Sequence, residues 1–107
     1  MDINSLHEFL ALTLLNRNDN FKNSYALNRA LEWKFQVFPV EKLKNEMVEK
    51  GLITRKETGI MYLYDITELG KTYMKNNFAE GKRLLFESFP NAFEFLDSLF
   101  EDYELPA

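Results

Sequence analysis

The chain has 107 residues, 46% of them hydrophobic, which fits one globular domain with a substantial core. It contains no Cys, which excludes disulfides, thiolate metal sites and Cys nucleophiles. Its longest largely apolar run, residues 9–15, is far shorter than the roughly 20 residues that a membrane span needs. The formal net charge is −4, but residues 84–107 hold six acidic and no basic side chains, so residues 1–83 carry 13 basic and 11 acidic ones, a net charge of +2.

A local net charge of +2 is weak for tight DNA binding by one subunit, although phosphate binding depends on local basic charge and not on the total. The N-terminal residues have no basic region of the signal-peptide kind. We therefore expect a cytoplasmic protein without a membrane partner.

Three helices are predicted in the first half of the chain. The first should begin near Ser5, where Ser5-Leu6-His7-Glu8 is a capping-box pattern, and the Asn-rich residues 16–23 have a loop composition. A second helix begins at Ser24, and a third covers residues 39–50, since Pro39 suits the first helical position. The second and third helices form a helix-turn-helix, in which residues 39–50 are the recognition helix.

A β-hairpin is predicted after the third helix. Gly51 ends that helix, because a residue without Cβ adopts the left-handed C-terminal cap at little cost. Strands over residues 52–56 and 60–66 flank a turn in which Gly59 takes a positive φ. Thr67 then caps a fourth helix that runs to about Asn77.

The last quarter of the chain is acidic and rich in Phe. A bend is predicted at residues 79–81, and a helical region follows from Lys82, interrupted near residues 88–90. One apolar stripe of this region, with spacings of 4, 3, 4 and 3, consists of Phe89, Phe93, Leu96, Phe100 and Tyr103. A second stripe consists of Ala92, Phe95 and Leu99.

A helix with two apolar stripes must be covered on both, and a domain this small offers limited surface for that purpose. We therefore expect the first stripe to form the interface of an isologous homodimer, which its acidic residues would rim. The alternative is that the helix folds back onto its own domain.

Several short patterns occur in the order typical of one bacterial superfamily. They are Ser24-Tyr25-x-Leu27, Pro39, the spacing from Leu43 to Gly51-Leu52-Ile53, and Tyr64-x-Ile66-Thr67-Glu68-x-Gly70-Lys71. Over residues 5–77 the chain resembles the winged helix-turn-helix domain of bacterial transcription regulators, and it is most similar to the PadR and MarR families.

The resemblance implies a mainly α fold with a small β-hairpin wing: a winged helix-turn-helix domain over residues 1–79 and a C-terminal dimerisation segment over residues 80–107. It also implies a dimeric, DNA-binding transcription regulator that uses the recognition helix, 39–50, and the wing, 52–66. The wing departs from the family pattern, because only Arg55 and Lys56 are basic.

On the recognition helix, Lys42 and Lys44 are candidate phosphate contacts, and Asn45 could read an adenine edge in the major groove. The alternative is an ordinary solvated helix face. Residues 39–50 have a net charge of zero, from Lys42, Lys44 and Lys50 and from Glu41, Glu46 and Glu49.

On the wing, Arg55 and Lys56 would lie at the adjacent minor groove, where narrow A·T-rich DNA attracts cations. The alternative is that they protect an exposed strand from unwanted pairing. Arg29 on the second helix would meet the DNA backbone, unless it is simply a scattered surface charge.

Nothing in the sequence points to catalysis. There is one His, His7, the four Gly are dispersed, and no His/Cys spacing suits zinc. We expect no enzymatic activity, no cofactor and no metal. The alternative function is a winged-helix protein-interaction module that does not bind DNA and docks a protein through its aromatic, acidic C-terminal helix.

Overall fold

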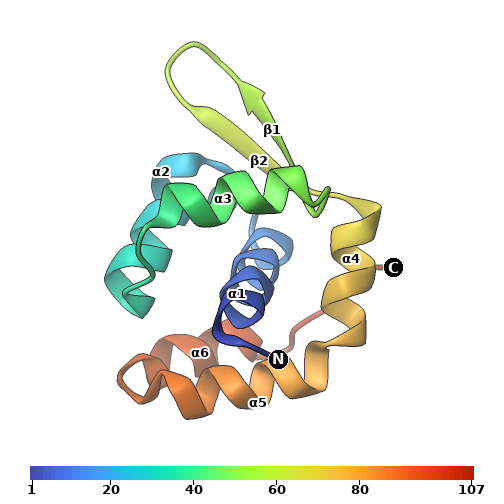
Figure 1. Cartoon of the computed structure of the whole chain (residues 1–107). Coiled ribbons are helices and arrows are strands. Elements are labelled where there is room, and N and C mark those ends of the chain that lie inside the picture. Colours follow the sequence, from blue (N-terminus) through green and yellow to red (C-terminus); the bar gives the residue numbers. More distant parts are fainter.

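Helix α1 lies at the centre of the molecule, with the other helices and the hairpin around it (Figure 1). The computed structural model describes residues 1–107. In chain order the elements are α1 (Ile3–Arg17), η1 (Asp19–Lys22), α2 (Ser24–Arg29), η2 (Ala30–Lys34), α3 (Val40–Glu49), β1 (Ile53–Glu57), β2 (Tyr62–Ile66), α4 (Glu68–Asn76), α5 (Phe78–Ser88), η3 (Pro90–Ala92) and α6 (Phe93–Phe100). The predicted fold class, mainly α with a small β-hairpin, is confirmed.

Helix α1 is buried on nearly every side. Its buried residues run without a gap from Glu8 to Leu15, so this helix is covered on more than one face. The helix begins at Ile3, two residues before the predicted start near Ser5, because Asp2 and not Ser5 is the N-cap. The Asp2 carboxylate accepts a hydrogen bond from the Ser5 amide at 2.8 Å. None of the helices combines the length and the apolar composition that crossing a membrane requires.

Helices α2 and α3 form the predicted helix-turn-helix. The side chain of Asn23 caps α2 by accepting from the Tyr25 amide at 2.7 Å, and α2 continues into the π-helical turn η2. The segment 16–23 is less irregular than predicted, because α1 extends to Arg17 and η1 follows it. Helix α3 begins after Pro39 and ends at Glu49, so the helix predicted over residues 39–50 is confirmed to within one residue at each end.

The hairpin follows α3 as predicted and extends away from the helices (Figure 1). Its two strands are antiparallel, with Ile53 opposite Ile66 and Glu57 opposite Tyr62. The positive φ predicted for Gly59 is confirmed at +92°. A bridge between Asn23 and Leu63 adds the segment before α2 to the free edge of β2, so the hairpin is tied to the start of α2.

The chain bends before α5, and not at residues 79–81 as predicted. Helix α4 ends at Asn76, and α5 runs without a break through Gly81. This glycine is needed for a close approach: a Cβ at Gly81 would lie 2.6 Å from two ring carbons of Phe9 on α1. The glycine that was predicted to mark a bend instead lets α5 pack directly on the central helix.

The C-terminal helices pack on their own domain, which is the alternative to the predicted dimer interface. Leu96 is fully buried and Phe100 is 7% exposed, both as part of one hydrophobic core shared with α1. Phe89 and Tyr103 are half-buried, and only Phe93 of the predicted interface stripe is mainly exposed, at 57%. Residues 80–107 therefore complete the core of residues 1–79.

Beyond α6, Tyr103 attaches the chain to α1. Its hydroxyl donates to the Thr13 carbonyl oxygen at 2.7 Å and accepts from the Asn16 amide at 3.1 Å. Rings of neighbouring elements surround it, with the Phe78 and Phe100 centroids 5.5 and 5.6 Å from its own. Burial raises the pKa of Tyr103 to about 12.

Replacing Gly70 by Ala should destabilise the protein. A Cβ at Gly70 would fall against the backbone carbonyl oxygen of Leu52, which is fixed because it accepts a hydrogen bond from the Thr67 amide at 3.1 Å. Gly to Ala inside a helix normally gains about 1 kcal/mol, but overpacking costs about 1–3 kcal/mol, so we expect a net loss. Urea unfolding of Gly70→Ala measures this loss, with Lys75→Ala on the same helix as the control. A Gly70→Ala variant as stable as the parent and as Lys75→Ala would contradict the prediction.

The protein should lose stability at alkaline pH through Tyr103. The pKa of the Tyr103 phenol is about 10 in the unfolded chain and about 12 in the folded protein. The contribution of the neutral phenol to the free energy of unfolding is therefore complete below about pH 10 and is lost as the pH rises from about 10 to about 12. Tyr103→Phe should be less stable by about 1 kcal/mol at pH 7, because it lacks the hydrogen bond to Thr13, and its stability should fall less steeply above pH 10. Urea titrations at several pH values from 8 to 11 measure this. If the parent and Tyr103→Phe lost the same amount of unfolding free energy over this range, Tyr103 would not cause the alkaline loss of stability.

Candidate nucleic-acid interface

The exposed face of α3 and the hairpin are joined by one hydrogen bond between two predicted site residues. Arg55 Nη1 donates to Asn45 Oδ1 at 2.6 Å, and the Arg55 guanidinium lies 5.0 Å from the centre of the Tyr62 ring. The structure therefore brings Asn45 and Arg55 together on one surface. Arg55 uses one of the two lone pairs of Oδ1, and Asn45 keeps its Nδ2 donor, so a reading of an adenine edge by Asn45 would share this oxygen with Arg55.

Lys44 does not belong to this surface, and its predicted role as a phosphate contact is wrong. Its side chain is 1% exposed, and its ammonium donates to Asn28 Oδ1 at 2.7 Å and pairs with Glu41 at 3.0 Å. The same ammonium lies 4.9 Å from the Tyr64 ring centre. Lys44 lies about 100° around α3 from the buried Leu43, and in this fold α2 and the hairpin cover that side of the helix too, through Asn28 and Tyr64.

The remaining lysines of this helix also have acidic partners. Lys42 is 72% exposed and lies 4.0 Å from Glu46, which is a weak surface pair. Lys50, after the last turn, donates to the buried carboxylate of Glu8 at 2.7 Å, and this hydrogen bond raises the pKa of Lys50. Every lysine of the predicted recognition helix is thus paired with a glutamate.

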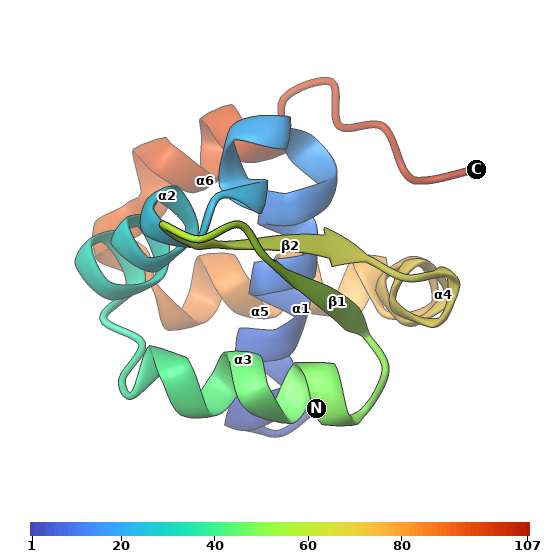
Figure 2. The same cartoon turned by 90° about the horizontal axis from the view of Figure 1, so that it is seen from above.

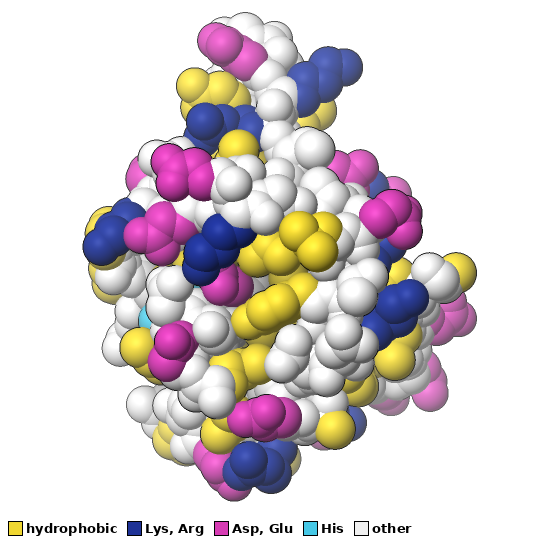
Figure 3. Space-filling view, turned by 45° about the vertical axis from the view of Figure 1, so that its right-hand side comes forward, with side chains coloured by type: hydrophobic (Ala, Val, Ile, Leu, Met, Phe, Trp, Pro, Cys, Tyr) yellow, Lys and Arg dark blue, Asp and Glu magenta, His cyan; other side chains and the backbone are white.

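The predicted cations outside α3 have no carboxylate partner. Lys56 is exposed and lies opposite Leu63 in the hairpin register, whereas Arg55 lies opposite Tyr64. Since neighbouring strand residues point to opposite faces, only Arg55 is turned toward α3. Figure 3 accordingly shows basic side chains on both sides of the hairpin and mixed charges below it, with no extended basic patch on this side.

Arg29 lies apart from these residues, on the outer face of α2. Its guanidinium is 4.7 Å from the Trp33 ring centre and 5.6 Å from that of Tyr25. Sequence reasoning did not single out these two rings, which are 73% and 64% exposed. The spacing of four residues between Tyr25, Arg29 and Trp33, which places them on one side of a helix, was the signal that could have identified them.

A groove of about 600 Å³ lies between the start of α2 and the hairpin tip. Tyr25 and Asn28 line one side of it, and Ile60 and Tyr62 line the other. Ile60 is 88% exposed, the highest fraction among the large apolar side chains. The hairpin tip thus presents apolar as well as basic groups to a partner.

No protein-family model matches the sequence, and no match was found among curated proteins or among solved structures.

We expect Lys44 to stabilise the folded protein and not to serve as a surface charge. Lys44→Ala should lower the free energy of unfolding by about 2 kcal/mol or more, because it empties a packed site under Tyr64. Lys44→Met keeps the volume but leaves the half-buried Asn28 Oδ1 and the exposed Glu41 without their lysine partner, so it should cost about 1 kcal/mol, less than Lys44→Ala. Lys42→Ala is the control on the same helix and should change stability by less than about 0.5 kcal/mol. Equal urea midpoints for Lys42→Ala and Lys44→Ala would show that Lys44 is not buried.

Proposed function

We propose that the chain is a transcription regulator that binds double-stranded DNA through the exposed face of α3 and the hairpin wing. The observation that carries this proposal is the hydrogen bond from Arg55 to Asn45, which holds the base of the wing against the exposed face of the recognition helix. The order of α2, α3 and the hairpin supports it, since this order suits insertion of α3 into a major groove with the wing beside it.

The residues of this surface divide into those that supply charge and those that could supply specificity. Lys42 and Lys56 are exposed lysines that would contact phosphates, and the weak Lys42–Glu46 pair can exchange for a phosphate. Arg55 keeps further N–H donors for a guanine edge or a phosphate, and Asn45 keeps Nδ2 for a base acceptor. Lys44 and Arg29 take no part in this surface.

A second candidate function is docking of a protein partner without DNA. It is favoured by the pairing of the α3 lysines with Glu46 and Glu41, which leaves the recognition helix without excess positive charge. The exposed apolar groups at the groove between α2 and the wing tip, Tyr25 and Ile60, suit a protein surface better than a phosphate backbone.

Gel-shift titrations over a salt series would separate the two functions. The DNA should be the promoter region next to the gene for this protein, with unrelated DNA of equal length for comparison. Replacing Arg55 and Lys56 together by Ala should weaken binding to both DNAs and reduce the slope of log affinity against log salt by about one per lost phosphate contact.

The matched control is Lys75→Ala, which removes an exposed positive charge from α4, and it should leave the slope unchanged. Asn45→Ala should reduce the preference for the promoter over unrelated DNA, and Glu46→Gln should tighten binding to both, because it frees Lys42. If the parent protein retains neither DNA at low salt, or if Lys75→Ala has the same effect as the wing variant, specific DNA binding by this surface is excluded and protein docking takes its place.

A further inference from the structure

A pocket of about 440 Å³, which we call the α4 pocket, lies between the first half of α1, the end of α3 and helix α4. Figures 1 and 2 show the end of α3 and α4 on the same side of α1. Small-molecule sites in proteins usually have volumes of about 300–1,000 Å³, so this pocket has room for a small ligand. None of the residues predicted to bind DNA lines it, so it is separate from the surface proposed for DNA.

The α4 pocket contains a buried charged group. The side chain of Glu8 is 3% exposed, and its Oε2 accepts a hydrogen bond from Lys50 Nζ at 2.7 Å. The second oxygen, Oε1, accepts no hydrogen bond within the chain, yet it is not closed to solvent, since the Tyr64 hydroxyl is the one buried side-chain polar atom without a partner. Because Glu8 lines the pocket, Oε1 offers a ligand a charged and largely desolvated acceptor.

Lys50 supplies the opposite charge at the same place. Its side chain is half-exposed, and its ammonium group keeps N–H donors beyond the one that bonds to Glu8. The hydrogen bond to Glu8 raises the pKa of Lys50, so this side chain keeps its positive charge at neutral pH. No other charged side chain lines the pocket, so its two charges cancel. A ligand that carries one positive and one negative group therefore matches this pocket better than a simple anion or cation.

Apolar and uncharged polar groups surround these two charges. Leu52 and Leu69 form an apolar wall, and Leu69 is 56% exposed, which leaves it open to a ligand. Asn76 on α4 is exposed, and its side-chain amide makes no hydrogen bond within the chain, so it can donate to a ligand or accept from one. Figure 3, in which the side of the molecule that carries α4 comes forward, shows apolar side chains in the middle of this face with charged groups around them.

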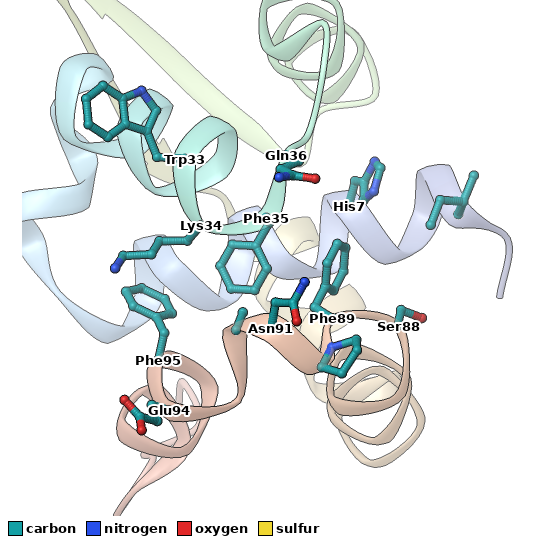
Figure 4. A pocket seen from close by; sticks show the side chains of 13 residues that line it. His7, Trp33, Lys34, Phe35, Gln36, Ser88, Phe89, Asn91, Glu94 and Phe95 are labelled. Atoms are coloured by element: carbon teal, nitrogen blue, oxygen red, sulfur yellow. The ribbon is translucent and has the colours of Figure 1, made fainter.

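A larger cavity, of about 610 Å³, lies between the end of η2 and the corner that joins α5 to α6 (Figure 4). Its charged side chains, Lys34 and Glu94, are exposed, and Figure 4 shows both at the end away from His7. Burial lowers the pKa of His7, so its imidazole is neutral at neutral pH. No buried charge thus marks this cavity for one class of ligand, whereas the contact between Glu8 and Lys50 does so for the α4 pocket.

We propose that the α4 pocket binds a free α-amino acid with an apolar side chain. The ammonium group of the ligand donates to Glu8 Oε1, and its carboxylate accepts from Lys50 Nζ, with Asn76 as a further donor at the rim. The two charged groups of an α-amino acid are attached to one carbon, which matches a carboxylate and an ammonium group in contact at 2.7 Å. Charges of opposite sign then alternate around the site, and the apolar side chain of the ligand lies on Leu52 and Leu69. A peptide terminus carries only one of these two charges, so a free amino acid fits the pocket better.

Isothermal titration calorimetry of the purified full chain, without DNA, tests this proposal independently of DNA binding. L-leucine is the probe, and we expect saturable binding with a dissociation constant below about 1 mM. L-leucinamide keeps the ammonium group and lacks the carboxylate, whereas N-acetyl-L-leucine keeps the carboxylate and lacks the ammonium group. Each should bind at least about tenfold more weakly than L-leucine, because one charge of the pocket then has no partner. These two compounds also represent the two ends of a peptide, so they separate a free amino acid from a peptide terminus.

Variants at the rim and at the buried charge locate the site. Asn76→Asp places a negative charge beside the carboxylate of the ligand and should weaken L-leucine binding by about tenfold. Asn20→Asp makes the same change at an exposed residue of η1, outside the pocket, and should leave binding unchanged. Leu69→Ala should reduce the preference for L-leucine over L-alanine, because it removes part of the apolar wall. Glu8→Gln keeps an acceptor for Lys50 but lacks the charge that holds the ligand's ammonium group, so it should abolish binding, and its urea midpoint shows whether the variant is folded.

Three results would overturn the proposal. The first is the absence of saturable binding of L-leucine, L-methionine and L-phenylalanine up to about 10 mM. The second is binding of L-leucinamide or N-acetyl-L-leucine as tight as that of L-leucine, because the pocket would then recognise a single charge. The third is L-leucine binding that Asn76→Asp and Asn20→Asp change to the same extent, because the ligand would then lie elsewhere on the protein.

Discussion

The enclosure of α1 is the constraint on which the rest of the structure depends. A helix that is apolar around its whole circumference has no face that can be left in water, so it must be surrounded by other elements. Leu10, Ala11, Leu12 and Thr13 follow one another at about 100° intervals around α1, and all four are buried. The hairpin, α3, α4 and α5 each cover part of this helix, which explains why so short a chain needs its C-terminal segment for its own core.

Burial of α1 also positions the candidate DNA-binding surface. The one acidic residue of α1, Glu8, is 2% exposed, and a buried carboxylate without a partner would cost several kcal/mol. Lys50 supplies the partner from the end of α3, while Lys44 contacts Asn28 on α2 and the Tyr64 ring on the hairpin. Two of the lysines that could have bound DNA are thus used to hold α3 in place, and the positive charge left for a ligand is mainly on the wing.

The Phe-rich C-terminal segment has a structural role in this arrangement. Phe78, Phe86, Phe100 and Tyr103 form a continuous group of tilted and edge-to-face rings over the end of α1. Phe100 is buried and the other three are half-buried within the monomer, so most of this ring surface is used by the chain's own fold.

The sequence by itself determined the element order, the helix over residues 39–50, the hairpin with the positive φ at Gly59, and the Thr67 cap, because these depend on local backbone preferences and on periodicity. It could not determine which partner covers an apolar stripe, so Leu96 and Phe100 were assigned to a dimer when they belong to the core. Nor could it distinguish a glycine at a bend from Gly81, which lets α5 approach Phe9. Only the tertiary structure decided that Lys44 is buried and that Arg55 meets Asn45, because both contacts join residues that are brought together by the packing around α1.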